Sequence, residues 1–293
     1  MTDPSRPSFN PLARRSWTDL GPRLASAIVL LVVATVGIYF GGYIFAVLVG
    51  AVFAGCYREW DRMVTLKRLD PAGGALIGLL ALSALVYPVL GPLSSLGVIA
   101  VAALIGLVFG GQPRAWRVAG IVFYGIVVVA ILAIRGEASG MLSGIVDIGF
   151  WALLFLGVVI WMTDTGAYFT GRQVGGERLA PGISPSKTWS GAIGGLALGT
   201  LAGLVLWLLI APQSPWWIGL LLAGAMSIIG QVGDLTESAI KRRFRVKDSG
   251  DIIPGHGGLM DRMDSLTFGA LFLFLVGFAH RGYDAIAAGF LNW

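Results

Sequence analysis

The sequence contains very little cysteine and few charged side chains. Cys56 is the only cysteine among 293 residues, so an intrachain disulfide is excluded. Charged residues make up 13% of the chain, whereas soluble domains carry roughly 25%. Because so few polar side chains cannot coat a water-facing surface, lipid must be the solvent for much of the protein. The net charge of +5 therefore indicates attraction to anionic membrane lipid, and nucleic acid is not an expected partner.

Apolar sequence is abundant instead, and it falls into nine stretches. A membrane-spanning helix needs roughly 17–25 predominantly apolar residues, and most of the stretches approach that length. They cover residues 24–40, 42–57, 72–90, 93–110, 117–134, 148–169, 191–211, 215–235 and 264–280. We therefore predict an all-α polytopic integral membrane protein with about nine transmembrane helices.

The distribution of lysine and arginine predicts the orientation of these helices. If residues 1–23 form a cytosolic arm, 19 of the 21 Lys and Arg residues lie on the cytosolic side, and only Arg135 and Arg281 lie outside. This asymmetry is what the positive-inside rule requires. We expect a cytosolic N-terminus and an outside C-terminus, with five spans in residues 24–145 and a catalytic membrane region in residues 146–293.

One polar segment follows the sixth apolar stretch. Asp164 lies near the inner end of that stretch, where a carboxylate is costly unless it is paired, hydrated or bound to a cation. Ser184, Lys187 and Thr188 then precede the seventh stretch. Hydroxyls, backbone N–H groups and an ammonium at a helix N-terminus can cradle a phosphate. The same residues can also form a simple capping turn, and the spacing leaves both alternatives open.

A second polar segment joins the last two apolar stretches and carries two groups of acids. If the helix continues past residue 233, one face carries Asp234, Glu237, Ser238 and Lys241. The same spacing groups Asp261, Asp264 and Ser265 at the start of the last stretch. Two carboxylate pairs would then project from adjacent helices at one membrane depth, and oxygen ligands of this kind suit Mg²⁺.

The alternative is that these acids only neutralise basic neighbours at the membrane interface. The adjacent pair Arg58 and Glu59 is expected to do just that. The explanation is harder to hold for four acids that flank two spans beside a basic loop rich in glycine.

The residues of the second segment resemble a known signature. The run Ser238-Ala-Ile-Lys241-Arg242, then Lys247-Asp248, Pro254-Gly-His256-Gly-Gly and Asp261-Arg262-Met-Asp264 is similar to that of the phosphatidate cytidylyltransferases, or CDP-diacylglycerol synthases. Asp164-Thr-Gly-Ala-Tyr and Ser184-Pro-x-Lys187-Thr-Trp resemble a further block of the same family. The resemblance covers residues 160–270, whereas the first five spans match only in hydrophobicity.

The resemblance implies an enzyme of phospholipid biosynthesis in a bacterial-type inner membrane, with its site facing the cytosol. Its substrates would be CTP and phosphatidate, and its products CDP-diacylglycerol and pyrophosphate. The family depends on Mg²⁺, here expected as two divalent or mixed cations, and its aspartates that match Asp234 and Asp261 are associated with the metal.

The residues and the resemblance together give the following candidates. Catalytic candidates are Asp234, Asp261, Lys241 and Lys187; substrate-binding candidates are Ser184, Lys187, Thr188, Ser238, Lys241, Arg242, Lys247, His256 and Arg262; metal-binding candidates are Asp234, Asp261, Glu237, Asp264 and Asp164. His256 could act as a base, but a hydrogen bond to a phosphate or carboxylate is favoured for it.

Two other functions and one question about helix packing stay open at this point. A transporter for a phosphorylated anion would favour charges at the membrane midplane and an internal repeat, whereas here the charges gather at the cytosolic edge. A lipid kinase that uses CTP would release CDP rather than pyrophosphate. Glycines at positions 191, 195, 199 and 203 could mark a homodimer seam or close packing within one chain.

Overall fold

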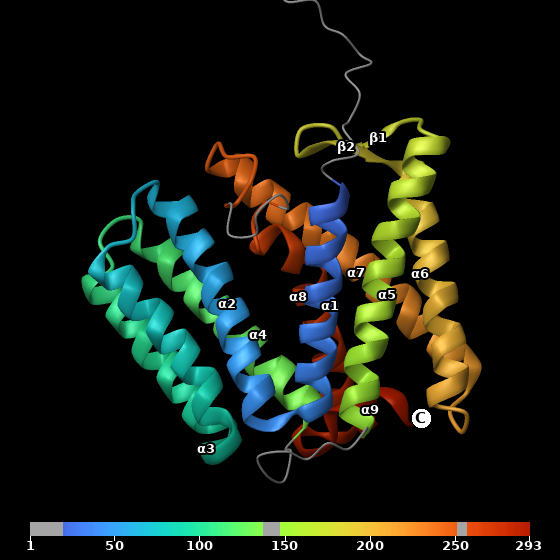
Figure 1. The fold of residues 1–293 in the computed structure, drawn as a ribbon, viewed down its shortest axis with the longest axis horizontal. Coiled ribbons are helices and arrows are strands. Elements are labelled where there is room, and N and C mark those ends of the chain that lie inside the picture. The colour runs from blue at the N-terminus through green and yellow to red at the C-terminus, as the bar shows by residue number, and fades with distance from the viewer. Residues whose placement is uncertain (1–19, 137–146, 251–256) are drawn as a thin grey trace, which may run out of the picture.

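The computed structural model describes residues 20–136, 147–250 and 257–293, and these residues are nearly all helical (Figure 1). The helices are α1 (Leu20–Phe40), α2 (Gly42–Thr65), α3 (Pro71–Phe109), α4 (Arg114–Arg135), α5 (Ile148–Gln173), α6 (Trp189–Ile210), α7 (Trp216–Arg243), α8 (Met260–Arg281) and α9 (Ile286–Leu291), with a 3-10 turn, η2 (Tyr283–Ala285), before α9. Helix α8 contacts α2, α4, α5 and α7.

One element departs from the all-α expectation. Strands β1 (Arg178–Ala180) and β2 (Ser184–Thr188) form a small antiparallel hairpin between α5 and α6. Ser184 precedes Pro185, and the proline ring disfavours helical backbone in the residue before it. The segment that was expected to be a loop or capping turn is therefore extended, and it leads directly into α6.

Seven of the described helices, α2 to α8, are long and apolar enough to cross a membrane. Helix α3 has 39 residues, but Gly91 has a φ of +74°. The Ser95 hydroxyl donates a hydrogen bond to the Ser83 carbonyl at 2.7 Å, although twelve residues of straight helix would separate them by about 18 Å. The chain therefore turns back at Gly91, and α3 contains two of the nine apolar stretches. The count of nine spans and the orientation of the termini stay predictions.

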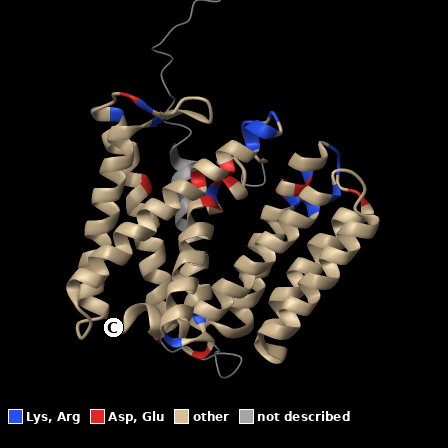
Figure 2. Ribbon diagram, turned by 180° about the vertical axis from the view of Figure 1, so that it is seen from behind, with Lys and Arg blue, Asp and Glu red and all other residues tan. Residues whose placement is uncertain are grey.

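The charged residues are distributed unevenly along the molecule. Figure 2 shows most Lys, Arg, Asp and Glu residues at the end where the β-hairpin lies and where α7 ends, with a small group at the opposite end. Arg135, the last residue of α4, pairs with Asp147, the N-cap of α5, at 2.7 Å. This distribution agrees with the asymmetry of lysine and arginine in the sequence.

The glycine stripe of α6 packs within the chain. A Cβ atom added at Gly195 would lie 2.7 Å from the Thr163 carbonyl oxygen of α5, and one at Gly191 would lie 3.0 Å from the Ala167 carbonyl oxygen. The small residues therefore allow the α5 and α6 backbones to approach closely. Of the two interpretations of the stripe, the structure supports packing within one chain.

A buried ion cluster joins α2, α3 and α4 near their charged ends. The Arg117 guanidinium donates to Asp61 at 2.6 and 3.0 Å and to Asp70 at 2.6 and 3.0 Å. The side chains of Arg117 and Asp61 are 1% and 2% exposed. The hydrogen bond from Arg117 is the largest influence on Asp70, and it lowers the pKa of this half-exposed carboxyl.

Replacing Arg117 with leucine is expected to cost about 3–5 kcal/mol of stability, because Asp61 would stay buried without its partner. The measurement is the thermal unfolding midpoint of the purified protein in detergent. Arg114→Leu is the control, since Arg114 is exposed one turn earlier on the same helix. An equal unfolding midpoint for the two variants would contradict the prediction.

Candidate active site

Lys241 joins two acids at the charged end of the molecule. Helix α7 continues to Arg243, so the condition for the shared face is met, and Lys241 lies one turn after Glu237. The Lys241 ammonium lies 3.1 Å from Glu237 Oε1 and 2.6 Å from Asp261 Oδ1. All three side chains are largely buried. The two carboxylates compensate the desolvated ammonium, and the pairing ties the end of α7 to the start of α8.

Asp261 is held on both of its carboxylate oxygens. Oδ1 faces Lys241, and Oδ2 accepts hydrogen bonds from the backbone N–H groups of Ser249 at 3.1 Å and Gly258 at 3.3 Å. Asp261 lies in the first turn of α8, where the helix dipole favours a negative charge. The Asp261 carboxylate is thereby fixed in position by α7, by the segment that follows α7 and by the segment that precedes α8.

Lys187 and Asp234 form a second ion pair between β2 and α7. The Ser238 hydroxyl also lies 3.5 Å from Asp234 Oδ1, which confirms that these two residues share a face of α7. Thr188 caps α6, because its hydroxyl accepts a hydrogen bond from the Gly191 N–H at 3.1 Å. The capping interpretation is therefore confirmed for Thr188, while a phosphate-binding role of the Ser184–Thr188 strand stays a prediction.

Two further carboxylates face the same region. Asp164 of α5 and Asp264 of α8 are both close enough to Asp234 to interact with it electrostatically. Asp264 also accepts the Ser265 N–H at 2.7 Å. Arg262 lies within electrostatic reach of Asp164. The site thus collects five acids from three helices, and Lys187 and Lys241 are the lysines paired with them.

The carboxylates of the site have the donor chemistry that a magnesium ion needs. Within residues 20–136, 147–250 and 257–293, no three Asp, Glu, His or Cys side chains converge as a preformed ion cage. Magnesium, however, is usually bound through one or two carboxylates, with substrate phosphates and waters completing its shell. Oxygen donors in excess over the paired lysines fit that chemistry.

The remaining described candidates are Arg242, Ser184 and Lys247. The Arg242 guanidinium donates to the backbone carbonyls of Ile183 at 3.1 Å and Val246 at 3.2 Å, so it braces the hairpin against the segment after α7. Ser184 pairs with Ala180 in the hairpin, and Lys247 is exposed. His256 lies outside the described residues.

Glu59 was misjudged from the sequence. It is 2% exposed, and its Oε2 accepts the Met260 N–H at 2.8 Å and the Ser249 hydroxyl at 3.1 Å. Rather than neutralising Arg58 at the surface, Glu59 caps the first helical residue of α8 from another helix. The available signal was its spacing of three residues from Cys56, which places it on the buried face of α2.

The sequence of this chain is similar to those of known proteins. The profile of the cytidylyltransferase family matches residues 22–279. A phosphatidate cytidylyltransferase of Brucella abortus is 35% identical over 280 residues, which cover 94% of this chain and 100% of that protein. The Brucella suis protein of the same name shows the same identity and coverage. A Staphylococcus haemolyticus phosphatidate cytidylyltransferase is 48% identical over 120 residues, covering 41% of this chain and 46% of that protein.

Proposed function

Because the chain belongs to the cytidylyltransferase family, we propose that this nucleotidyltransferase moves CMP from CTP to phosphatidate, giving CDP-diacylglycerol and pyrophosphate. The observation that carries the proposal is the full-length similarity to the Brucella phosphatidate cytidylyltransferases. The acidic cluster with its two paired lysines, at the charged end of a bundle of apolar helices, supports it.

The reaction needs charge compensation more than it needs a base. Phosphatidate already carries a nucleophilic phosphate, since a second pKa near 6 leaves a phosphomonoester with about 1.5 to 2 negative charges. A lipid phosphate oxygen forms a bond to the α-phosphorus of CTP, and the bond from that phosphorus to the oxygen bridging to the β-phosphate breaks. Pyrophosphate leaves with the electron pair. The obstacle is the repulsion between two polyanions.

The chain supplies groups that reduce this repulsion. Lys187 and Lys241, now paired with Asp234 and Asp261, would also contact the substrate phosphates. Their positioned positive charges would stabilise the negative charge of the transition state. The hairpin carries Lys187 to α7, and the Lys241 pair fixes α7 against α8. Substrate contacts from Ser238, Arg242, Lys247, His256 and Arg262 belong to the same proposal.

Mg²⁺, as one of two divalent or mixed cations, would be held by Asp234 and Asp261 with Glu237, Asp264 and Asp164. When bound, it supplies neutralisation of the attacking and leaving oxygens. The acids of this chain would hold the ion in place, and Lys187 and Lys241 would stand beside them to contact the substrate phosphates.

The membrane arrangement belongs to the proposal as well. Nine spans, a cytosolic N-terminus and an outside C-terminus would place the acidic cluster at the cytosolic face of an inner membrane, where CTP is available. The excess of charge at that end of the molecule supports this orientation (Figure 2). A homodimer is compatible with this arrangement.

A product assay on the purified protein tests the function. Phosphatidate, CTP and Mg²⁺ are supplied in detergent, and pyrophosphate, CDP and CDP-diacylglycerol are quantified, with a chelator in a parallel sample. We expect equimolar CDP-diacylglycerol and pyrophosphate, and neither product with the chelator. CDP in place of pyrophosphate would identify a lipid kinase. No nucleotide product from a folded sample would overturn the enzymatic assignment and favour transport.

A further inference from the structure

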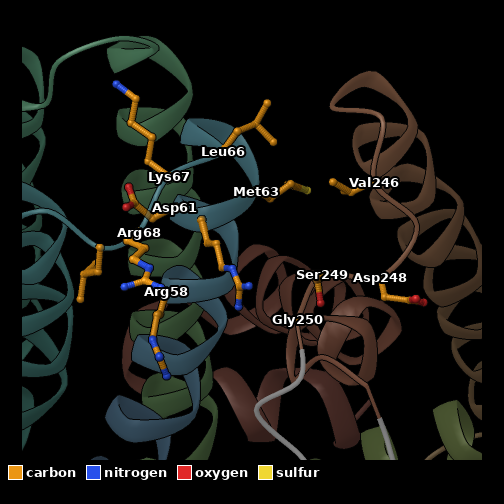
Figure 3. Close-up of a pocket in the computed structure, with 12 residues that line it drawn as sticks. Arg58, Asp61, Met63, Leu66, Lys67, Arg68, Val246, Asp248, Ser249 and Gly250 are labelled. Atoms are coloured by element: carbon orange, nitrogen blue, oxygen red, sulfur yellow. The ribbon is translucent and has the colours of Figure 1, made fainter.

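A cavity of about 950 Å³ opens beside the acidic cluster, between the end of α2 and the segment that follows α7 (Figure 3). Figure 3 shows Arg58, Lys67 and Arg68 on the α2 side, with Asp248 and Ser249 across from them. The sequence did not single out this place as a site. None of the candidate catalytic or metal-binding residues lines it.

The cavity is strongly basic. Among the described residues, four cationic side chains line it, namely Arg58, Arg62, Lys67 and Arg68, together with two acids, Asp61 and Asp248. Asp61 gives the lining little compensation, because its two oxygens already bind the buried Arg117 guanidinium. Arg58, Lys67 and Arg68 bring like charges around one hollow, where they repel each other, and a cavity wall strengthens their field. An anion bound between them would relieve that repulsion.

One lining residue of the cavity, Ser249, contacts the candidate active site. Ser249 lines the cavity, its N–H donates to Asp261 and its hydroxyl donates to Glu59. Ser249 would therefore contact both a ligand in the cavity and the Asp261 carboxylate at the start of α8. This continuity distinguishes the cavity from ordinary cytosolic basic residues that only orient a membrane protein.

We propose that this basic cavity is a binding site for the phosphate group of an anionic ligand. The source favoured by the lining is a membrane lipid, because exposed Leu66 and Leu69 stand beside the cations and are 69% and 51% exposed. An apolar rim next to a cationic hollow matches a lipid phosphate with its glycerol backbone and acyl chains. A nucleotide would offer the same phosphate chemistry without the apolar part.

This inference deepens the proposed function and rests on it only in identifying the lipid as the substrate phosphatidate. Held in the cavity, the lipid phosphate would approach the acidic cluster from the side of Ser249, while the lysine pairs stay available to the nucleotide. The two polyanions would thus be compensated by separate sets of cations before they meet.

Direct binding to the full-length protein in neutral detergent tests the proposal without turnover. The probes are a short-chain phosphatidate, the matching phosphatidylcholine, CTP and pyrophosphate, each titrated calorimetrically. The variants are Arg58→Gln and Arg68→Gln. Arg243→Gln is the matched control, because Arg243 is exposed on α7 and does not line the cavity. Unfolding midpoints are measured for all of them.

We expect each cavity variant to weaken phosphatidate binding roughly tenfold, the loss typical of one charge-assisted hydrogen bond, with CTP binding and the control unchanged. A selective loss of CTP or pyrophosphate binding would keep the phosphate site and assign it to the nucleotide. Unchanged binding of all three anions in folded variants would overturn the proposal. Intact anion binding sites without cytidylyl transfer would instead count against the proposed function alone.

Discussion

Replacing Asp261 with asparagine is expected to lower the rate of CDP-diacylglycerol formation by about two to three orders of magnitude, the usual cost of removing one positioned charge from an active site. The aspartate meets an ammonium on one oxygen and two backbone N–H groups on the other. An amide has a single acceptor oxygen, so its NH₂ group must face either Lys241 or the two N–H donors. The substitution therefore both removes charge and mismatches the hydrogen bonds.

The measurement is initial-rate kinetics of product formation, with the unfolding midpoint recorded for each protein. Asp284→Asn is the matched control, because Asp284 is exposed in the turn between α8 and α9. Asp261→Glu keeps the charge but moves it by one methylene, and we expect it to fold and bind CTP with a reduced kcat. Wild-type rates for folded Asp261→Asn would exclude Asp261 from the catalytic machinery.

Much of the helical architecture could be predicted because lipid imposes a simple rule on sequence. A backbone in hydrocarbon must satisfy its own hydrogen bonds, so long apolar stretches form helices. The described helices α2 to α8 confirm this. The pairing of Lys241 with Glu237 was also accessible, since residues four apart share a helix face. These inferences depend only on local spacing.

The contacts that assemble the site depend on packing between helices, which local spacing does not encode. Glu59 and Met260 are separated by 201 positions, and Arg117 and Asp61 by 56. Lys187 reaches Asp234 because the chain between α5 and α6 forms a hairpin, whereas the spacing left open only a phosphate cradle or a simple capping turn. An acid beside an arginine in sequence, as Glu59 is beside Arg58, does not reveal that the arginine is exposed while the acid is buried.

The assembled contacts suggest a division of labour between the two halves of the chain. Residues after 146 supply the acids and both lysines of the cluster. The end of α2 and the linker after it contribute the cations of the basic cavity, and α2 contributes the capping carboxylate Glu59; both reach the cluster through Ser249. The N-terminal helices would then hold the lipid and set the position of α8, rather than serve only as a membrane anchor.

Replacing Glu59 with alanine is expected to lower kcat by about one to two orders of magnitude, even though Glu59 touches no substrate in this proposal. Without the carboxylate, the Met260 N–H and the Ser249 hydroxyl lose their acceptor in a buried place, which costs about 1–3 kcal/mol of stability. The start of α8 and the Ser249 segment are then free to shift, and Asp261 shifts with both. A displacement near 1 Å at a reacting group can cost about a hundredfold in rate.

Rescue by the conservative variant separates this positioning role from a general loss of stability. Glu59→Gln keeps an acceptor oxygen for the Met260 N–H, so we expect it to recover most of kcat. For Glu59→Ala we expect a lower kcat with a KM for CTP that is nearly unchanged. Glu177→Ala is the control, because Glu177 is an exposed acid in the segment before β1. Equal kcat for the alanine variant and wild type, or equal losses in the alanine and glutamine variants, would contradict the role. Recovery with glutamine would show that the buried acceptor, rather than its negative charge, aligns Asp261 for the reaction.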